Sequence, residues 1–243
     1  KAASPAWVVL KFGGTSVSSV ERWETIAALV RQRLAEGLRP VVVHSALATV
    51  SNKLDELLHR ALEMDVTAQV AGIRELHLRL AAGLQVDGEK ELGGYFRELE
   101  QLLAGIHLIR EVSPRIQARV MGLGELMATR LGAAYLARVG LKVTWLDARE
   151  LLRSNMPPGT NERSAWLAAN CDFDPDAELQ ARFAAEAGVV LTQGFIASNA
   201  RGDGVLLGRG GSDTSGAYFA AKLQAAVLEI WTDVPGMFTA NPK

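Results

Sequence analysis

Short runs of consecutive apolar residues recur along the chain, and each run is followed by a glycine or a polar turn. A continuous run of this length is typical of a strand that is buried on both faces of a sheet. We expect such strands at residues 7–10 (ending at Lys11-Phe12), 40–43, 141–146, 189–192 and 228–231.

Between these runs, apolar residues recur at three- and four-residue spacing, which is typical of amphipathic helices. The pattern predicts helices around residues 23–34, 52–82, 89–109, from Ser113-Pro114 to about 131, and 214–223, with a loop over 153–164. Strands that alternate with helices predict an α/β fold, a three-layer α/β/α sandwich with a largely parallel central sheet. The helices between 52 and 131 form a helical insertion in it.

Composition narrows the class of protein. The 243 residues, 49% of them hydrophobic, suffice for one large domain or two packed lobes. Lys and Arg number 26 against 27 Asp and Glu, so no net field attracts nucleic acid or an anionic membrane. Cys171 is the single cysteine, and no apolar run approaches the roughly 18–20 residues of a membrane span. We expect a cytoplasmic protein.

The first candidate for chemistry is Lys11-Phe12-Gly13-Gly14-Thr15-Ser16, where a lysine ends a strand before a glycine turn. Free backbone N–H groups and a helix N-terminus favour phosphate there, and the lysine would stabilise a transferred phosphoryl group. A tight turn with a solvated lysine is the alternative. The chain contains neither G-x-x-x-x-G-K-[ST] nor G-x-G-x-x-G, which argues against a Walker loop and a dinucleotide site.

The second candidate is Gly208-Arg209-Gly210-Gly211-Ser212-Asp213, directly before a predicted helix. Glycines let a ligand approach the backbone, and Arg209 offers a two-pronged donor to a carboxylate or phosphate. The alternative is that Ser212 or Asp213 only caps the helix. An arginine among three glycines exceeds what a cap needs, so a ligand site is favoured.

The third candidate is Glu125, which shares its helix face with small or apolar residues. A carboxylate in such surroundings needs a partner, and the neighbouring Gly122 and Gly124 indicate close packing or ligand approach. An exposed glutamate on an irregular helix is the alternative.

A fourth candidate follows the strand at 40–43, because open α/β sheets bind ligands at strand carboxyl ends. Ser45, Ser51 and Asn52 lie there, with helix capping as the alternative for the last two. We interpret His44 as a core or rim histidine, since the other histidines lack metal-ligand spacing. The turn-rich segment 231–243 also follows a strand and is a weaker candidate.

Taken together and in this order, residues 11–17 (KFGGTSV), 208–213 (GRGGSD) and 232–236 (TDVPG) resemble the signatures of the amino acid kinase family, and within it of the aspartate kinase catalytic domain. The resemblance covers nearly the whole chain. It implies transfer of a phosphoryl group from ATP to the side-chain carboxylate of L-aspartate, giving 4-phospho-L-aspartate for lysine, threonine and methionine biosynthesis. Mg²⁺ would be carried with ATP, with no metal ligands from protein side chains, and no covalent enzyme intermediate is expected.

The resemblance also implies residue roles. The catalytic residues would be Lys11, acting with the Gly13 and Gly14 amides on the transferring phosphate, and Asp213, orienting the lysine. Aspartate would be bound by Ser45, Ser51, Glu125 (at its ammonium), Arg209 (at its α-carboxylate), Gly210 and Ser212. The nucleotide would be bound by Lys11, Gly13, Gly14, Thr15, Thr232, Asp233, Phe238, Pro242 and Lys243.

Some positions depart from the family pattern. Phe238 replaces a common tyrosine, Ser51 a common threonine and residues 241–243 (NPK) a common Asp-Pro-Arg, and none of these changes removes a required charge. The chain stops before the family's second ATP-facing lysine and any regulatory domain, so the resemblance implies part of a longer polypeptide. Residues 1–200 would be mainly the substrate lobe and 201–243 the start of the nucleotide lobe.

A looser likeness, at residues 43–45 and 156–158, is to the kinase part of bifunctional aspartate kinase/diaminopimelate decarboxylase proteins. The family commonly forms homodimers. Alternatives stay open: a kinase for another acid such as acetylglutamate, or a non-catalytic nucleotide-binding or assembly module. A dehydrogenase is disfavoured by the missing dinucleotide motif.

Overall fold

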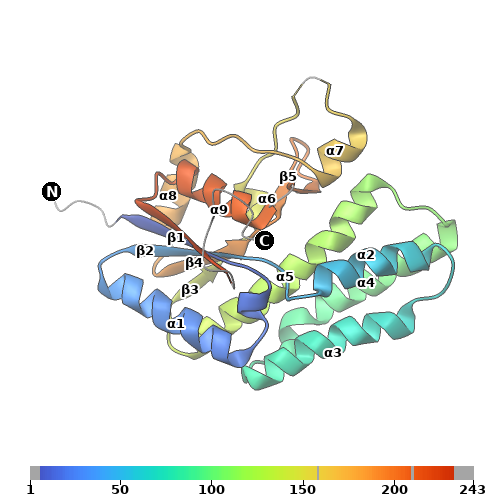
Figure 1. The fold of residues 1–243 in the computed structure, drawn as a ribbon, viewed down its shortest axis with the longest axis horizontal. Helices are drawn as coiled ribbons and strands as arrows, with labels where there is room; N and C mark the ends of the chain where they lie inside the picture. The colour runs from blue at the N-terminus through green and yellow to red at the C-terminus, as the bar shows by residue number, and fades with distance from the viewer. Residues whose placement is uncertain (1–5, 158, 209–210, 233–243) are drawn as a thin grey trace, which may run out of the picture.

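The computed structural model describes residues 6–157, 159–208 and 211–232 of the chain. Within them a five-stranded parallel sheet has the order β3-β4-β2-β1-β7 (Figure 1). Its strands are β1 (Trp7–Phe12), β2 (Arg39–His44), β3 (Val143–Trp145), β4 (Val189–Gln193) and β7 (Val227–Trp231). β1 and β2 pair from Trp7 beside Arg39 to Phe12 beside His44, so their carboxyl ends finish side by side.

Helices cover both faces of this sheet. On one face α1 (Val20–Ala35) contacts β2, and α5 (Pro114–Arg138) contacts β3 and β4. On the other face α9 (Gly211–Lys222) packs on β1 and β7 and is flanked by α8 (Ala177–Ala185) (Figure 1). The predicted three-layer sandwich with a parallel sheet is confirmed.

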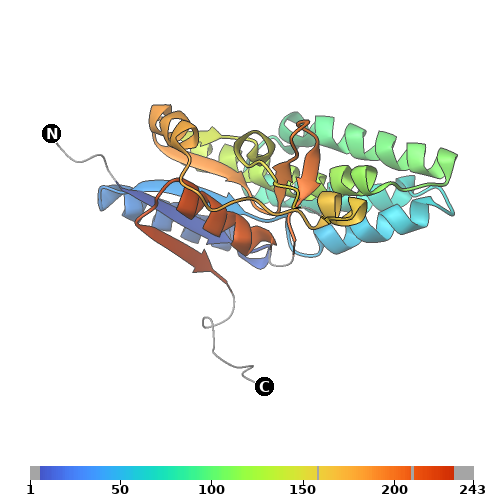
Figure 2. The ribbon, with the colours of Figure 1, turned by 90° about the horizontal axis from the view of Figure 1, so that it is seen from above.

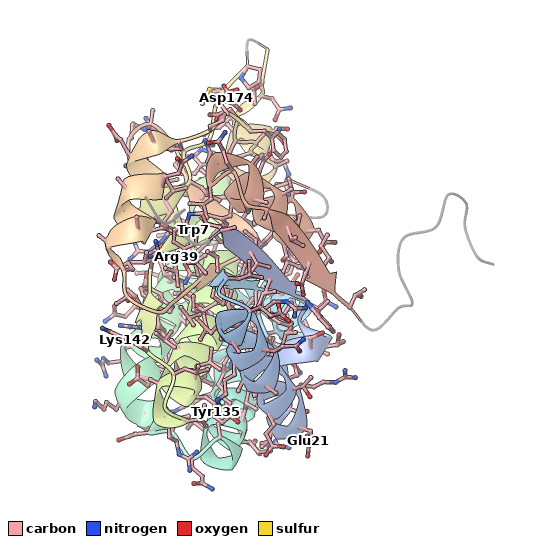
Figure 3. The ribbon with its side chains drawn as sticks, turned by 90° about the vertical axis from the view of Figure 1, so that its left-hand side faces the viewer. Trp7, Glu21, Arg39, Tyr135, Lys142 and Asp174 are labelled. Atoms are coloured by element: carbon pink, nitrogen blue, oxygen red, sulfur yellow. The ribbon has the colours of Figure 1, made fainter. Side chains whose placement is uncertain are left out.

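Arg39 connects the C-terminus of α8 to the amino ends of β1 and β2. Its guanidinium lies 4.1 Å from the centre of the Trp7 ring, and both side chains are marked in Figure 3. The same guanidinium donates to the carbonyl oxygens of Phe183, Ala184 and Glu186 at the end of α8. A cation at a helix C-terminus is also favoured by the helix dipole.

The helical insertion lies between β2 and β3. It consists of α2 (Val50–Ala61), α3 (Thr67–Gly83), α4 (Gly88–Ile109) and the first part of α5, which lie together beyond one end of the sheet (Figure 2). The prediction of a single helix over 52–82 is wrong, because the helical conformation is interrupted between Ala61 and Thr67. There Asp65 Oδ1 accepts from both the backbone N–H and the hydroxyl of Thr67 and so starts a second helix. The start of α5 at Ser113-Pro114 is as predicted, since Ser113 Oγ accepts from Ile116 N–H.

The outer strands differ from expectation. The runs at 141–146 and 228–231 were expected to be buried, but β3 is short and half-buried and β7 is largely exposed. Among the described residues both are edge strands with a single neighbour, so one side lacks cover. No helix in the part of the chain that the structure describes is long and apolar enough to cross a membrane.

Several short elements carry no strong periodicity and were not predicted. They are the 3₁₀ helix η1 (Thr15–Val17), α6 (Ala148–Leu151) and the antiparallel hairpin β5 (Ile196–Ser198) with β6 (Gly204–Leu206). The loop expected over 153–164 ends early, because Asn161 caps α7 (Glu162–Leu167). Likewise α9 begins at Gly211 rather than near residue 214.

Candidate functional site

A pocket of about 690 Å³ opens at the carboxyl ends of β1 and β2. Every predicted site residue that the structure describes lines it: Lys11, Gly13, Gly14, Thr15, Ser45, Ser51, Glu125, Ser212, Asp213 and Thr232. The remaining predicted site residues lie outside the described residues: Arg209, Gly210, Asp233, Phe238, Pro242 and Lys243. The pocket therefore joins segments that are far apart in the sequence.

Lys11 enters the pocket from the end of β1. Its side chain is only 8% exposed and forms an ion pair with Asp213, whose side chain is 55% exposed, in the first turn of α9. Gly216 makes room for it, because a Cβ at that position would lie 3.2 Å from Lys11 Cβ. The interpretation of Lys11 as a solvated surface lysine is therefore wrong. Its ammonium is held beside the pocket by a carboxylate that stays accessible to water.

The turn after β1 packs tightly against the loop after β2. A Cβ at Gly14 would lie 2.8 Å from the Ala46 carbonyl oxygen, closer than real Cβ contacts allow. Among the described residues, a Cβ at Gly13 would have one neighbour within 4 Å, Lys11 Nζ at 3.8 Å. The second glycine of the pair is therefore required by packing between two backbone segments.

These two glycines give a matched test of that packing. We expect Gly14→Ala to lower the free energy of unfolding by about 1–3 kcal/mol, because the backbone of one segment must move. Gly13→Ala should stay within about 0.5 kcal/mol of the wild type. Urea denaturation of both variants measures this, and equal stability of the two would contradict the close approach.

Glu125 projects from α5 and is only 2% exposed. Its Oε1 accepts from Ala46 N–H at 3.3 Å, while its buried Oε2 has no hydrogen-bond partner among the described residues. Burial raises the pKa of this carboxyl to about 8. The alternative of an exposed glutamate is wrong. A buried acceptor oxygen at a pocket wall fits a ligand that brings its own donor, such as an ammonium group.

The glycines around Glu125 serve packing. A Cβ at Gly124 would lie 3.1–3.3 Å from atoms of Ala46, Leu54 and Val50, and one at Gly122 would lie 3.4 Å from Ile196. The loop after β2 thus lies directly against the helix that carries Glu125.

Two helix N-termini border the pocket. α2 begins at Val50 with Thr49 as its N-cap residue, and no side chain caps it. Ser51 therefore lies in the first turn and is no cap, which excludes the capping alternative. Ser212 and Asp213 likewise lie within the first turn of α9. Helix N-termini favour anions, so both ends suit phosphate or carboxylate groups.

Ser45 connects the two sides of the pocket. Its hydroxyl donates to Ser212 Oγ at 2.7 Å, which links the loop after β2 to the start of α9. Both hydroxyls lie on the pocket wall and can exchange this bond for one to a ligand.

His44, directly before Ser45, belongs to the core. It is fully buried, its ring packs edge-on against Trp23, and its Nδ1 lies 2.9 Å from the Ser45 carbonyl oxygen. Burial lowers its pKa to about 4, so it is neutral near pH 7. The prediction of a core histidine is confirmed.

Sequence reasoning missed the lining residues Ala46, Leu47, Ala48, Thr49 and Phe195. Most of them are apolar and shape the wall through their backbone, so no side-chain chemistry points to them. Thr49 and Phe195 have positive φ angles of 71° and 66°, a conformation that their residue types do not announce.

A glycine turn, a buried lysine and two helix N-termini lie at the carboxyl edge of a parallel sheet, which makes this an α/β protein with a pocket that is suited to anionic groups. More particularly, the chain belongs to the amino acid kinase family, whose sequence model matches residues 6–243.

Several relatives are aspartokinases. Lysine-sensitive aspartokinase 3 of Escherichia coli (strain K12) is 33% identical over 241 residues, which cover 97% of this chain and 51% of the relative. Bifunctional aspartokinase/homoserine dehydrogenase 1, chloroplastic, of Arabidopsis thaliana is 32% identical over 248 residues, 98% of this chain and 26% of the relative.

The fold agrees with solved structures. The crystal structure of E. coli aspartokinase III in complex with aspartate and ADP superposes with a TM-score of 0.81 at 32% identity, over 97% of this chain and 51% of that one. The chain thus spans about half of the E. coli relative and about a quarter of the Arabidopsis one.

Proposed function

We propose that this chain provides the aspartate kinase reaction, phosphorylation of the L-aspartate side-chain carboxylate by ATP as an early step of amino-acid biosynthesis. One observation carries the proposal: a single pocket holds a glycine turn with a buried lysine and a buried glutamate, one oxygen of which has no hydrogen-bond partner in the described part of the chain. The E. coli relative, solved with aspartate and ADP, supports this choice of substrates.

In the proposed reaction a side-chain oxygen of aspartate attacks the γ-phosphorus of ATP. The bond from that phosphorus to the β,γ-bridging oxygen breaks, and ADP leaves with the electron pair. Lys11 and the N–H groups of Gly13 and Gly14 stabilise the charge on the transferring group, while Asp213 orients the lysine. Positioning and electrostatics carry this catalysis, without a covalent enzyme intermediate.

Aspartate would lie between the loop after β2 and the start of α9. Glu125 Oε2 would accept from its ammonium group, and Arg209 would pair with its α-carboxylate. Further contacts are proposed for Ser45, Ser51, Gly210 and Ser212. The uncapped N-terminus of α2 adds a favourable field for either carboxylate.

ATP would lie over the turn after β1 and toward the end of β7. Its binding residues are proposed to be Lys11, Gly13, Gly14, Thr15 and Thr232, and beyond the described residues Asp233, Phe238, Pro242 and Lys243. Of the described lining residues only Glu125 and Asp213 carry carboxylates, and Asp213 is paired with Lys11. This donor set fits a Mg²⁺ ion held chiefly by ATP phosphates and water.

The setting of the reaction is also a proposal. The greater length of the relatives supports a longer polypeptide, with residues 1–200 as mainly the substrate lobe and 201–243 as the start of the nucleotide lobe. We also propose that the protein acts in the cytoplasm as a homodimer. Its proposed pathway is diaminopimelate and lysine biosynthesis.

The reaction is tested by hydroxylamine trapping, since hydroxylamine converts an acyl phosphate into a hydroxamate, which gives a coloured complex with ferric ion. The natural polypeptide that contains residues 1–243 is incubated with Mg²⁺, ATP and either L-aspartate or N-acetyl-L-glutamate. We expect hydroxamate with L-aspartate only. Product with N-acetyl-L-glutamate instead would assign another acid, and ATP binding without any product would indicate a non-catalytic module.

A further inference from the structure

The loop of residues 45–48, between β2 and α2, separates two pockets. Leu47 and Ala48 line the pocket of about 690 Å³ described above and also a second pocket of about 410 Å³. The second pocket is bordered by the start of α1 and by Leu76, Arg79 and Leu80 of α3. Ala46 and Leu47 are buried, whereas Ala48 is only partly buried, so hydrogen bonds contribute to the position of the Ala48 end of this loop.

Ser18, next to η1, makes two of these bonds. Its hydroxyl donates to the Gly14 carbonyl oxygen at 2.6 Å and accepts from Ala48 N–H at 2.8 Å. Two other backbone N–H groups of the loop donate over longer distances: Ser45 to the Phe12 carbonyl oxygen and Ala46 to Glu125, both at 3.3 Å. One hydroxyl thus ties the turn that carries the phosphate-binding amides to the loop that carries Ser45.

We propose that Ser18 is a positioning residue for phosphoryl transfer, an inference that rests on the proposed function. Ser18 lines the second pocket and not the catalytic one, so it touches neither substrate. It fixes the spacing between the phosphate-binding turn and the acceptor-binding loop. In-line transfer needs that spacing, because the acceptor oxygen must stand close to the γ-phosphorus.

Removal of the hydroxyl leaves the groups of each half of the site in place, and we expect it to loosen the spacing between the two halves. In Ser18→Ala the Ala48 N–H and the Gly14 carbonyl lose their partner, whereas Lys11, Glu125 and Ser45 remain. We expect kcat to fall about tenfold to hundredfold, since a misplacement near 1 Å has an effect of that order. The KM values for ATP and aspartate should change less than kcat.

The experiment compares Ser18→Ala, Ser18→Thr and Ser19→Ala in the natural polypeptide that contains these residues. Ser18→Thr keeps the hydroxyl and should restore most of kcat. Ser19→Ala is the matched control, because the Ser19 hydroxyl bonds with Arg22 N–H and with the Glu21 side chain at the start of α1. A second readout is hydrogen exchange of the Ala48 amide, which should accelerate in Ser18→Ala and not in Ser19→Ala.

Loss of kcat together with faster Ala48 exchange supports the proposal. Wild-type kcat in Ser18→Ala, or an equal loss in Ser19→Ala, overturns it, as does unchanged Ala48 exchange. If Ser18→Ala does not fold, Ser18→Cys replaces it, since a thiol is a weak hydrogen-bonding group of similar size. Absence of hydroxamate from the wild type would refute the proposed function instead, and the exchange measurement would still test the tether.

Discussion

Lys11→Ala is expected to lower kcat about hundredfold to thousandfold, the loss typical of a preorganised donor at a developing charge. Lys11 is nearly buried and forms an ion pair with Asp213 beside the pocket, so its ammonium group is held in position before ATP binds. Fold stability should change little, because the Asp213 side chain is 55% exposed and water can solvate it once the lysine is gone. Steady-state kinetics and thermal unfolding measure the two effects separately.

Lys222 is the matched control for this variant. It is also nearly buried and forms an ion pair with an aspartate, Asp172, at 2.6 Å, but it lies at the far end of α9 and does not line the pocket. Lys222→Ala is expected to leave kcat unchanged. If both variants lose kcat equally, or if Lys11→Ala keeps it, Lys11 does not act on the transferred group.

Glu125→Gln is expected to raise the KM for aspartate about 30- to 100-fold and to leave the KM for ATP nearly unchanged. The carboxylate would accept from the substrate ammonium group inside a buried wall, where a charged hydrogen bond is worth about 2–3 kcal/mol. Glutamine keeps the shape of the side chain and an acceptor oxygen but removes the charge. An equal rise in the KM for ATP would contradict the assignment.

The same residue predicts a pH dependence. Burial raises the Glu125 pKa to about 8, so in the free enzyme this carboxyl is largely protonated below that pH. It must lose its proton to bind an ammonium group. The value of kcat/KM for aspartate should therefore rise as the pH approaches about 8 and then level off, and this rise should be absent in Glu125→Gln. A flat profile for the wild type between about pH 6 and pH 9 would contradict the role.

The free energy of unfolding should fall as the pH rises, whereas kcat/KM for aspartate should increase. Burial raises the pKa of Glu125 from its ordinary value of 4.5 to about 8 in the folded state, so its contribution to stability is fully present below about 4.5 and is lost as the pH rises to about 8. Without aspartate, Glu125→Gln should therefore gain stability relative to the wild type as the pH rises from about 4.5 to about 8, and the difference should level off above 8. Urea denaturation at several pH values provides the check.

The core of the fold could be predicted from the sequence because its signals are local. The apolar run at 7–10, the glycine turn after it and the serine-proline helix start each depend on neighbouring residues alone. The helix break near Asp65 and the exposure of β7 could not be predicted in this way. At the first, the Asp65 side chain accepts two hydrogen bonds from Thr67, and the second depends on which strands lie beside β7.

In the site, too, local motifs could be predicted from the sequence, and features that depend on distant segments could not. The spacing of Lys11 from two glycines and of Arg209 from Asp213 could be recognised in the sequence. The burial of Glu125 could not, because it depends on the loop after β2 lying against α5, a contact between segments about 80 residues apart. Ser18 also escaped notice, since a serine after a turn is common and its partners are backbone groups.

The most direct test of the central claim follows an oxygen atom from aspartate into phosphate. L-Aspartate labelled with ¹⁸O in its side-chain carboxylate is incubated with the natural polypeptide, Mg²⁺, ATP and hydroxylamine, and the released phosphate is analysed by ³¹P NMR. We expect phosphate that carries one ¹⁸O, because the labelled oxygen attacks the γ-phosphorus and stays with it when hydroxylamine attacks the carbonyl carbon. Phosphate without the label would mean that water, not aspartate, accepts the phosphoryl group, and would contradict the account.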